Sequence, residues 1–420
     1  MSAPVGVLCA LRGDAEAAAA RGLDGERGLV VTRRCADLPE LLGAAAAGLG
    51  AVAVVSTDLP GLDRDAVAHL HACGVWVLAV PADGDVRGRG LAVGADAETD
   101  AGDPADTVPM GARALLGRAA LGERPGGTAP TVMLPPPEPL RVADDAHPGR
   151  LVAVWGPTGA PGRTTVAINL ATELALVGRR QWSTLLVDAD TYGGTVAQAL
   201  GLLDEAPGIA AAGRAAGAGR LDAGTLAALA PTLESGLRVL TGISRAGRWP
   251  ELPAASLAEV WAVARRAAAW TVVDCGFNLE DDEALSYDTR APRRNAATLS
   301  ALAAADVVVV VGAGDPVGMQ RLVRGLAELS EAGVVALRAV VVNRVRASAS
   351  GPHPREAVRD ALRRYAGVEA RIVVEDQPAC DGALLRARTL AEHAPSSPVR
   401  RAVAALAADL LSLPVPAGAH

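Results

Sequence analysis

The sequence contains no lysine, so all 40 of its basic residues are arginine. Any site chemistry that ordinarily uses an ammonium group must therefore be carried out by a guanidinium group, or be lost. Long blocks of one charge are also missing, and the formal net charge is −7. Binding of nucleic acid through bulk positive charge is not expected, although a local arginine patch is compatible with this composition.

Cysteine is scarce as well, and the five cysteines are isolated and lack the spacing of metal ligands. We interpret them as buried free thiols in a reducing compartment. Residues 1–11 have no positively charged region and only a short apolar run, so they do not resemble a signal peptide. No run reaches the ~18 apolar residues of a membrane span. These features predict a cytoplasmic protein.

The 420 residues, half of them hydrophobic, predict two domains. In residues 1–122, short apolar runs alternate with helical patterns, which predicts a flavodoxin-like α/β domain with a parallel sheet. The predicted strands are Val5–Ala10, Gly28–Thr32, Ala51–Ser56, Val75–Val80 and a fifth near Ala95–Glu98. The predicted helices are Asp14–Arg21, Asp37–Ala46, Arg64–Ala72 and Pro104–Ala120.

Residues 123–149 are rich in proline and glycine and predict a linker. A second alternation predicts a mostly parallel α/β domain over residues 150–413, followed by a tail over 414–420. Its predicted strands are Leu151–Trp155, Ser183–Val187, Leu237–Thr241, Trp270–Asp274, Val307–Val311, Ala339–Val342 and Ala370–Val374. The helices predicted between them include Thr164–Val177, Ala255–Ala268, Ala291–Ala304 and Pro316–Ala332.

A glycine-rich segment, Gly156–Thr165, joins the first strand of this second domain to a helix. Glycines let a backbone wrap around an anion, and the N–H groups of a helix N-terminus point at phosphates. Threonine hydroxyls at the end of such a loop can bind Mg²⁺ and phosphate. A glycine-rich turn without a ligand is the alternative. The candidate phosphate-binding residues are Gly159, Ala160, Pro161, Gly162, Arg163, Thr164 and Thr165.

Asp188 and Asp190 follow the next predicted strand, at the sheet edge where the glycine-rich loop lies in this topology. Two carboxylates placed there can hold Mg²⁺-bound water and orient an attacking water molecule. We therefore take both as candidate catalytic residues. A surface turn is the alternative.

These segments together resemble the ParA/MinD family of P-loop ATPases. Thr158–Thr165 aligns with the family's loop K-G-G-x-G-K-T-T, so Thr158 and Arg163 stand where the family has lysines. In that family the second lysine contacts the β and γ phosphates, and the first reaches across a face-to-face dimer to the partner's nucleotide. Thr158 carries no charge, and a guanidinium is bulkier than an ammonium group. The resemblance therefore implies slow or absent hydrolysis.

The same resemblance assigns roles to the acidic residues. Asp190 would be the hydrolysis-linked residue of the family's D-x-D switch, and Asp188 would support it. The strand that ends in Asp274 resembles Walker B, and Gly276 would let the backbone approach the γ-phosphate. Asn343 resembles the strand-end asparagine that reads adenine, although a turn asparagine explains it equally well. The implied cofactors are ATP and Mg²⁺, with Thr164, Asp190 and Asp274 as the metal ligands.

Two arginines, Arg293 and Arg294, precede a predicted helix and could supply charge that the loop has lost. A solvated helix end is the alternative. In a similar way, Val399–Leu411 predicts an amphipathic helix that either packs on its own domain or contacts a membrane. Contact with DNA is likewise left open.

Ala51–Asp63 resembles the third strand of a response-regulator receiver. The phosphoacceptor position is Ser56, no acidic pair follows the first strand at 9–11, and the expected lysine falls near Asp100. Because aspartyl phosphorylation needs a carboxylate and acids that hold Mg²⁺, this domain resembles a pseudo-receiver that docks partners.

A pseudo-receiver joined to a ParA/MinD domain resembles the CpaE/TadZ group, which positions Flp pilus machinery, and the related septum-site-determining proteins. The resemblance implies a homodimer, pilus or septum assembly proteins as partners of the N-terminal domain, and a location in the cytoplasm or peripherally at the inner membrane, cell pole or septum. Two functions remain open: a slow Mg²⁺-dependent ATPase, and a non-hydrolysing scaffold that acts through protein–protein contacts.

Overall fold

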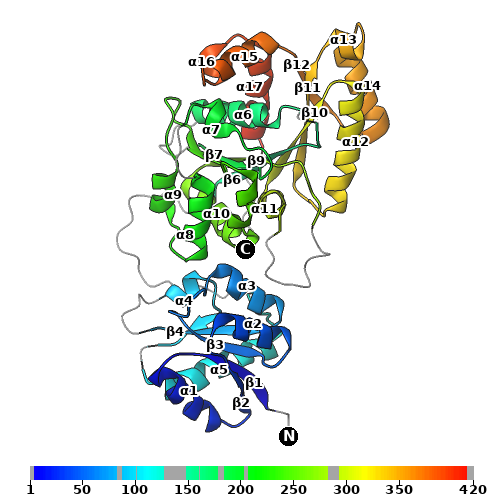
Figure 1. Ribbon diagram of the computed structural model, residues 1–420. Coiled ribbons are helices and arrows are strands. Elements are labelled where there is room, and N and C mark those ends of the chain that lie inside the picture. Colours follow the sequence, from blue (N-terminus) through cyan, green and yellow to red (C-terminus); the bar gives the residue numbers. More distant parts are fainter. Residues whose placement is uncertain are drawn as a thin grey trace. The chain divides into compact units, whose positions relative to one another are not determined.

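The computed structural model of the chain describes residues 4–82, 88–100, 102–126, 148–159, 161–177, 184–202, 207–281 and 293–413. The chain forms two units, each built on a parallel sheet of its own (Figure 1). Both units are α/β, as the alternation of apolar runs and helical patterns predicts.

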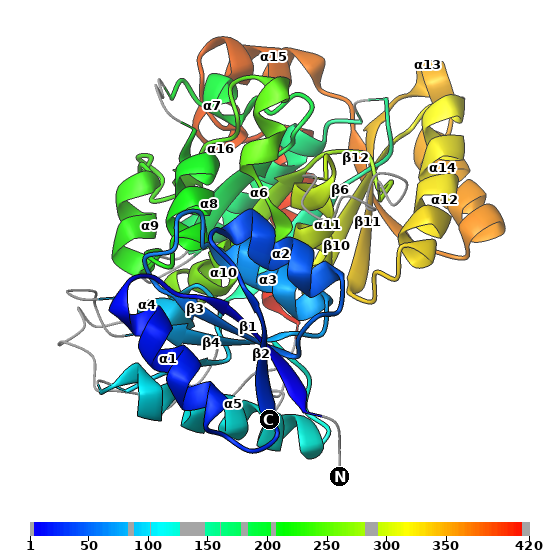
Figure 2. The same cartoon turned by 60° about the horizontal axis from the view of Figure 1, so that its bottom comes forward.

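The first unit has a five-stranded sheet in the order β2-β1-β3-β4-β5, with every neighbouring pair parallel. This is the strand order of the flavodoxin-like fold. Helices α1 and α5 pack on one face of the sheet, and α2 and α3 pack on the other (Figure 2). The elements are β1 (Val5–Ala10), α1 (Asp14–Asp24), β2 (Leu29–Arg34), α2 (Leu38–Ala46), β3 (Val52–Ser56), α3 (Arg64–Ala72), β4 (Trp76–Val80), α4 (Arg89–Ala92), β5 (Ala97–Glu98) and α5 (Pro104–Ala120).

Aspartate side chains fix the start of three of these helices. Asp37, Asp63 and Asp103 each accept a hydrogen bond from a backbone N–H in the first turn, over 2.8–2.9 Å. Such N-caps satisfy donors that have no partner within the helix. Asp37 is therefore the cap of α2 and not its first residue, which corrects the predicted start by one position.

The second unit has a seven-stranded parallel sheet in the order β12-β11-β10-β6-β9-β7-β8. Alternate side chains of the strands pack against α6 and α17 on one face, while α10 and α11 cover the other (Figure 1). The elements are β6 (Arg150–Trp155), α6 (Arg163–Val177), β7 (Thr184–Ala189), α7 (Val196–Ala199), α8 (Gly208–Gly217), α9 (Ala223–Leu229), β8 (Arg238–Leu240), the 3₁₀ helix η1 (Ala246–Glu251), α10 (Ala254–Ala267), β9 (Trp270–Cys275), α11 (Ala296–Ala304), β10 (Val307–Ala313), α12 (Pro316–Glu331), β11 (Leu337–Val345), α13 (Ala347–Ser350), α14 (Pro354–Ala366), β12 (Ala370–Val374), α15 (Gln377–Leu385), α16 (Leu390–His393) and α17 (Pro398–Leu411).

Several predicted boundaries in this unit differ from the structure, and two of them lie next to candidate site residues. Strand β11 continues to Val345, and its register shifts between Val342 and Val345, where Arg344 adopts a positive φ of 56°. Asn343 therefore lies at an irregularity inside the strand and not after its end. Helix α11 begins at Ala296 and not at 291, because residues 293–295 form a turn that precedes it.

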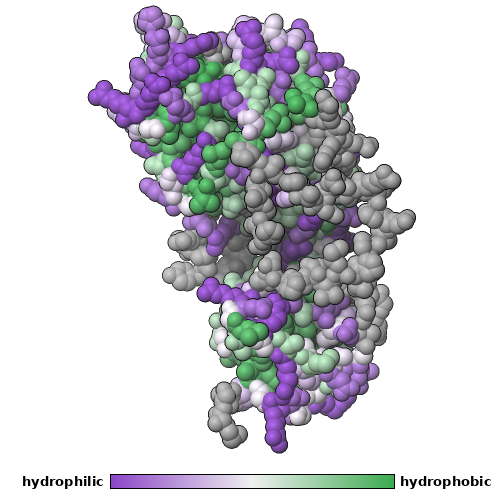
Figure 3. Space-filling view, turned by 180° about the vertical axis from the view of Figure 1, so that it is seen from behind, coloured by the Kyte–Doolittle hydropathy of each residue, from purple (hydrophilic) through white to green (hydrophobic). Residues whose placement is uncertain are grey.

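The predicted amphipathic helix is α17, and its apolar side chains are buried against the sheet and α6. Arg400 of α17 pairs with the buried Glu173 of α6 over 2.7 Å, so one of the two arginines that suggested lipid binding has a structural role. Among the described residues, no helix is both long and apolar enough to cross a membrane. On the face shown in Figure 3, hydrophilic and apolar side chains of the second unit are interspersed.

Candidate functional site

The glycine-rich loop between β6 and α6 has a backbone that only glycine readily adopts. Gly159 and Gly162 have φ values of 105° and 95°, which lie in the left-handed region. A side chain on Gly156 would collide with the backbone carbonyl of Val311 in β10, so this glycine lets the loop cross the neighbouring strand closely. Ala160, also predicted to bind phosphate, lies outside the described residues.

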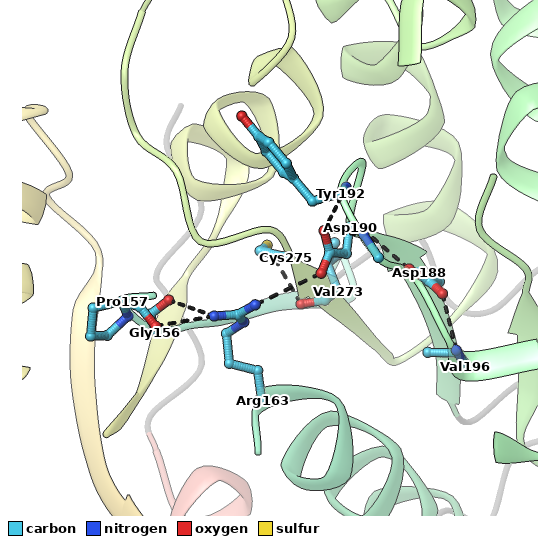
Figure 4. A network of polar contacts seen from close by, with 10 residues as sticks. Gly156, Pro157, Arg163, Asp188, Asp190, Tyr192, Val196, Val273 and Cys275 are labelled. Carbon is cyan, nitrogen blue, oxygen red and sulfur yellow. Dashed lines mark hydrogen bonds and ion pairs between the residues drawn. The ribbon is translucent and has the colours of Figure 1, made fainter. Parts of the chain in front are cut away.

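Arg163, the first residue of α6, connects this loop to the acidic end of β7 (Figure 4). Its Nη1 donates to the backbone oxygens of Gly156 and Pro157 at 3.0 and 3.2 Å. Its Nη2 lies 3.8 Å from Oδ2 of Asp190. The side chain is only 12% exposed, so the guanidinium is largely withdrawn from water. A lysine could not make these three contacts in this way, because its charge sits on a single nitrogen.

The two candidate catalytic carboxylates differ in their surroundings. Asp188 is buried near the end of β7 and accepts hydrogen bonds from the N–H groups of Asp190 and Val196 at 3.2 and 3.1 Å. Burial raises the pKa of the Asp188 carboxyl to about 7, although these two donors lower it. Asp190 accepts from Tyr192 N–H at 2.8 Å and from Gly193 N–H at 3.3 Å, which closes a turn after the strand.

Sequence reasoning missed Gly194 and Gly242, which make room for the Asp188 carboxylate. A side chain on either glycine would collide with that carboxyl group. Gly242 lies just beyond β8, whose neighbour in the sheet is β7. Gly242 could have been identified by its position just after the strand that neighbours β7. That neighbour is known only once the order of the strands in the sheet is known.

Asp274 completes the acidic edge from β9, the strand between β6 and β7. It pairs in register with Asp188, so two buried carboxylates lie on adjacent strands. Burial and the neighbouring Asp188 charge raise the pKa of Asp274 well above its ordinary value, and the nearby Thr164 hydroxyl lowers it in part. Neither carboxylate oxygen of Asp274 has a hydrogen-bond partner of regular geometry among the described residues.

The buried, unpartnered oxygens of Asp274 fit a cation. Buried charges are ordinarily paired or bound to a metal, and Arg163, which among the described residues lowers the pKa of Asp274 through its charge, is nearest to Asp190. Three or more acidic, histidine or cysteine side chains do not converge on a metal site in the part of the chain that the structure describes. That is compatible with Mg²⁺, which keeps several waters and takes few protein ligands beside phosphate oxygens. The candidate ligands are Thr164, Asp190 and Asp274.

Gly276 lies against the carboxylate of Asp190, and a side chain there would come within 3.3 Å of it. This glycine therefore lets the segment after β9 approach the segment after β7. The role that the resemblance assigns to Gly276, close approach of the backbone to a γ-phosphate, stays a prediction.

A cavity of about 200 Å³ lies at the α6 end of the loop. Its lining includes Gly162, Thr165 and Asn343, together with the segment 375–377 after β12. Asn343 is buried, and its Nδ2 donates to the backbone oxygen of Pro161 at 2.8 Å. The side chain that the sequence predicts to read a base thus holds the phosphate loop while lining the adjacent cavity.

Aromatic residues are rare in this chain, and three of them gather beside the acidic edge. The Tyr192 ring lies 4.9 Å from Phe277, the only phenylalanine, and the guanidinium of Arg294 lies 4.3 Å from the Tyr192 ring centroid. Arg294 also lies 5.9 Å from the Trp249 ring, and Arg293 pairs with Asp281 at 2.9 Å. Both arginines therefore have partners away from the loop, and neither replaces its missing charge in this conformation.

The Tyr192 hydroxyl fastens the segment after β7 to α11. It donates to Asn295 Oδ1 at 2.9 Å and accepts from Asn278 Nδ2 at 3.2 Å. Tyr192→Phe keeps the ring but loses both bonds, so we expect the free energy of unfolding to fall by about 1 kcal/mol. Urea denaturation measures the change. The control is Tyr365→Phe, whose side chain is 65% exposed, and an equal effect of the two variants would contradict this reasoning.

In the first unit, Ser56 is the last residue of β3. Its hydroxyl donates to Asp58 Oδ1 at 2.5 Å, so the serine is tied to the acid two residues later. β1 ends in the buried, uncharged residues Cys9 and Ala10. All five cysteines are free thiols, three of them buried and two half-buried.

Comparison with known proteins concerns the second unit. Residues 152–383 match the family described as the CobQ/CobB/MinD/ParA nucleotide binding domain. A ParA family ATPase from Chlorobium tepidum TLS is 16% identical with a TM-score of 0.52, and the match covers 63% of this chain and 99% of that chain. The cell division ATPase MinD of Pyrococcus furiosus is 19% identical with a TM-score of 0.50, over 63% and 100% of the two chains. At these identities the likeness is one of fold. No curated protein sequence matches the chain.

Proposed function

The chain belongs to the CobQ/CobB/MinD/ParA nucleotide-binding domain family, and from this premise we propose that residues 150–413 bind ATP together with Mg²⁺. The observation that carries the proposal is the buried acidic edge, at which Asp274 lies beside Thr164 and has no hydrogen-bond partner of regular geometry among the described residues. When bound, Mg²⁺ would offset the negative charge of the phosphate groups. Thr164, Asp190 and Asp274 would hold it.

The remaining groups divide the work of nucleotide binding. The backbone N–H groups at the start of α6 point along the helix axis toward an anion in the loop, and the guanidinium of Arg163 adds charge there. Asn343 and the segment 375–377 line a cavity beside the loop that suits a base. Asp190, at the end of β7, stands where a carboxylate can accept a proton from attacking water, with Asp188 buried behind it.

We further propose that nucleotide state controls dimerisation and thereby positions a cellular assembly. The relatives in fold include a protein described as a cell division ATPase, which supports septum positioning. The flavodoxin-like first unit, with Ser56 at the phosphoacceptor position and uncharged residues at the end of β1, supports a pseudo-receiver that docks partner proteins. Pilus machinery of the CpaE/TadZ kind is the other assembly that this arrangement would suit.

A second candidate function is a non-hydrolysing scaffold. The observation that favours it concerns positions 158 and 163 of the loop, where the ParA/MinD family has lysines. Thr158 is exposed and uncharged, and Arg163 donates to the loop's own carbonyls. A loop whose cation is engaged in this way binds phosphate only when the guanidinium exchanges partners, which slows hydrolysis or removes it.

Calorimetric titration of the full chain with ATP, with and without Mg²⁺, tests the proposal, and a phosphate-release assay separates the two functions. We expect Mg²⁺-dependent ATP binding. If the protein is an ATPase, Asp190→Ala should reduce phosphate release on the order of 100-fold and weaken ATP binding far less, because Thr164 and Asp274 would still hold Mg²⁺. The exposed Asp360→Ala on α14 is the matched control. Binding without release identifies the scaffold, and absence of binding overturns the proposal.

A further inference from the structure

Arg321 of α12 lies against the tip of the phosphate loop. A side chain on Gly159 would collide with Nη1 of Arg321, so the guanidinium occupies the space beside that glycine. Arg321 and Thr158 line the same small cavity, about 50 Å³ in volume, beside the loop. The arginine is exposed, and it lies in the second turn of a helix that follows β10.

The positive charge of Arg321 is available for a ligand. Among the residues that the structure describes, none forms a hydrogen bond or an ion pair with it. The acid that lines the same cavity, Asp315, accepts from the N–H of Gly318 at 2.9 Å as the N-cap of α12. The other arginines considered for the site, Arg163 and Arg294, already have partners.

The positions of the two cavities indicate how a nucleotide would be oriented along the loop. The larger cavity, which suits a base, is lined by Gly162 and Thr165, while the loop residues that line the smaller one are Pro157, Thr158, Gly159 and Pro161. A nucleotide with its base in the larger cavity and its phosphates along the loop would have its inner phosphates at the start of α6. Its terminal phosphate would then be the one closest to Arg321.

We propose that Arg321 is the second phosphate-binding cation of this site and binds the terminal phosphate of a nucleoside triphosphate. The proposal rests on nucleotide binding by the second unit. A guanidinium donates two parallel hydrogen bonds to phosphate oxygens, and such charge-assisted bonds are among the strongest in proteins. Arg321 thus supplies from α12 the charge that Thr158 cannot supply from the loop, and it distinguishes ATP from ADP.

The test compares the affinities of the full chain for ATP and for ADP, both with Mg²⁺, by calorimetry. We expect Arg321→Ala to weaken ATP binding roughly 10- to 100-fold and to change ADP binding less than about 2-fold. Arg321→Lys should recover part of the ATP affinity, because the charge returns without the fork. Arg324→Ala, an exposed arginine on the same helix, is the matched control and should change neither affinity.

The outcomes separate the two proposals. Unchanged ATP affinity in Arg321→Ala, with ATP bound by the wild-type chain, would overturn the role of Arg321 alone. Equal losses for ATP and ADP would place Arg321 on an inner phosphate and contradict the terminal contact. Absence of binding by the wild-type chain would overturn nucleotide binding and this role together. Thermal unfolding of the variants shows whether they fold, and an exposed side chain should leave it unchanged.

Discussion

Replacing Asp274 with asparagine is expected to stabilise the ligand-free protein at about pH 8 and to remove its response to Mg²⁺–ATP. The carboxylate is buried without a partner, and the charge of Asp188 lies on the adjacent strand. Asparagine has nearly the same shape and no charge, so it relieves this repulsion. We expect the free energy of unfolding to rise by about 1–3 kcal/mol at that pH, the usual cost of a buried polar group that has no hydrogen-bond partner.

The sign of the pH dependence follows from the raised pKa values. The ordinary pKa of an aspartate is 3.8, whereas burial raises that of Asp188 to about 7 and that of Asp274 well above 3.8. Below the unfolded value both states hold the protons. As pH rises from there to about 7 the unfolded chain releases protons that the folded chain retains, so stability falls. The gain in Asp274→Asn should therefore be smaller at about pH 5 than at about pH 8.

Thermal unfolding at these two pH values, with and without Mg²⁺–ATP, measures both effects. The exposed Asp360→Asn on α14 should alter neither stability nor the ligand response. The charge of Asp274 lowers stability when no ligand is bound, but it is needed to bind Mg²⁺–ATP. Asp274→Asn should therefore raise the unfolding temperature of the ligand-free protein and abolish the further rise caused by Mg²⁺–ATP. Equal destabilisation of Asp274→Asn at both pH values would instead mean that the carboxylate has a structural partner.

Much of the fold could be predicted from local sequence because the strands are buried on both faces. Val5–Ala10 and Pro104–Ala120 match the structure at both ends, since a continuous apolar run bounded by turn residues or a capped helix leaves little choice of boundary. It could also be predicted from the sequence that the acidic strand ends lie at one edge of the sheet, because parallel strands joined by helices have their carboxyl ends at the same edge. Asp190 accordingly lies beside Arg163, and Asp274 lies beside Thr164.

What could not be predicted depends on contacts between distant segments. The irregularity at Asn343 arises from the shifted register with β12, and local sequence does not encode that register. The collision that excludes a side chain from Gly242 depends on β8 lying beside β7. Arg321 resembles any exposed helix arginine until α12 is placed beside the loop. From the sequence, Arg293 and Arg294 were the candidates to replace the positive charge that the loop lacks. In the structure Arg293 pairs with Asp281, and Arg294 lies over the Tyr192 ring.

Arg163→Ala is expected to lower both stability and nucleotide affinity, in contrast to Asp274→Asn. The guanidinium holds two loop carbonyls and lies near Asp190, and it is largely buried. Loss of these contacts leaves a carboxylate and two carbonyls without their cation, so we expect about 1–3 kcal/mol of destabilisation. ATP affinity should fall by roughly 100-fold or more, because the loop loses its own positive charge. Calorimetry and urea denaturation measure the two effects, with the exposed Arg359→Ala as control.

Arg163→Lys separates the role of charge from that of shape. In a chain without lysine, arginine at this position could be a simple replacement that preserves charge, and the lysine variant would then equal the wild-type chain in every respect. The geometry predicts otherwise, because one ammonium group cannot reach Gly156, Pro157 and Asp190 together. We expect ATP affinity within roughly 10-fold of the wild-type value but stability close to that of Arg163→Ala. Full stability in Arg163→Lys would show that the loop needs only a positive charge, and that the guanidinium contacts with the loop carbonyls contribute nothing to the fold.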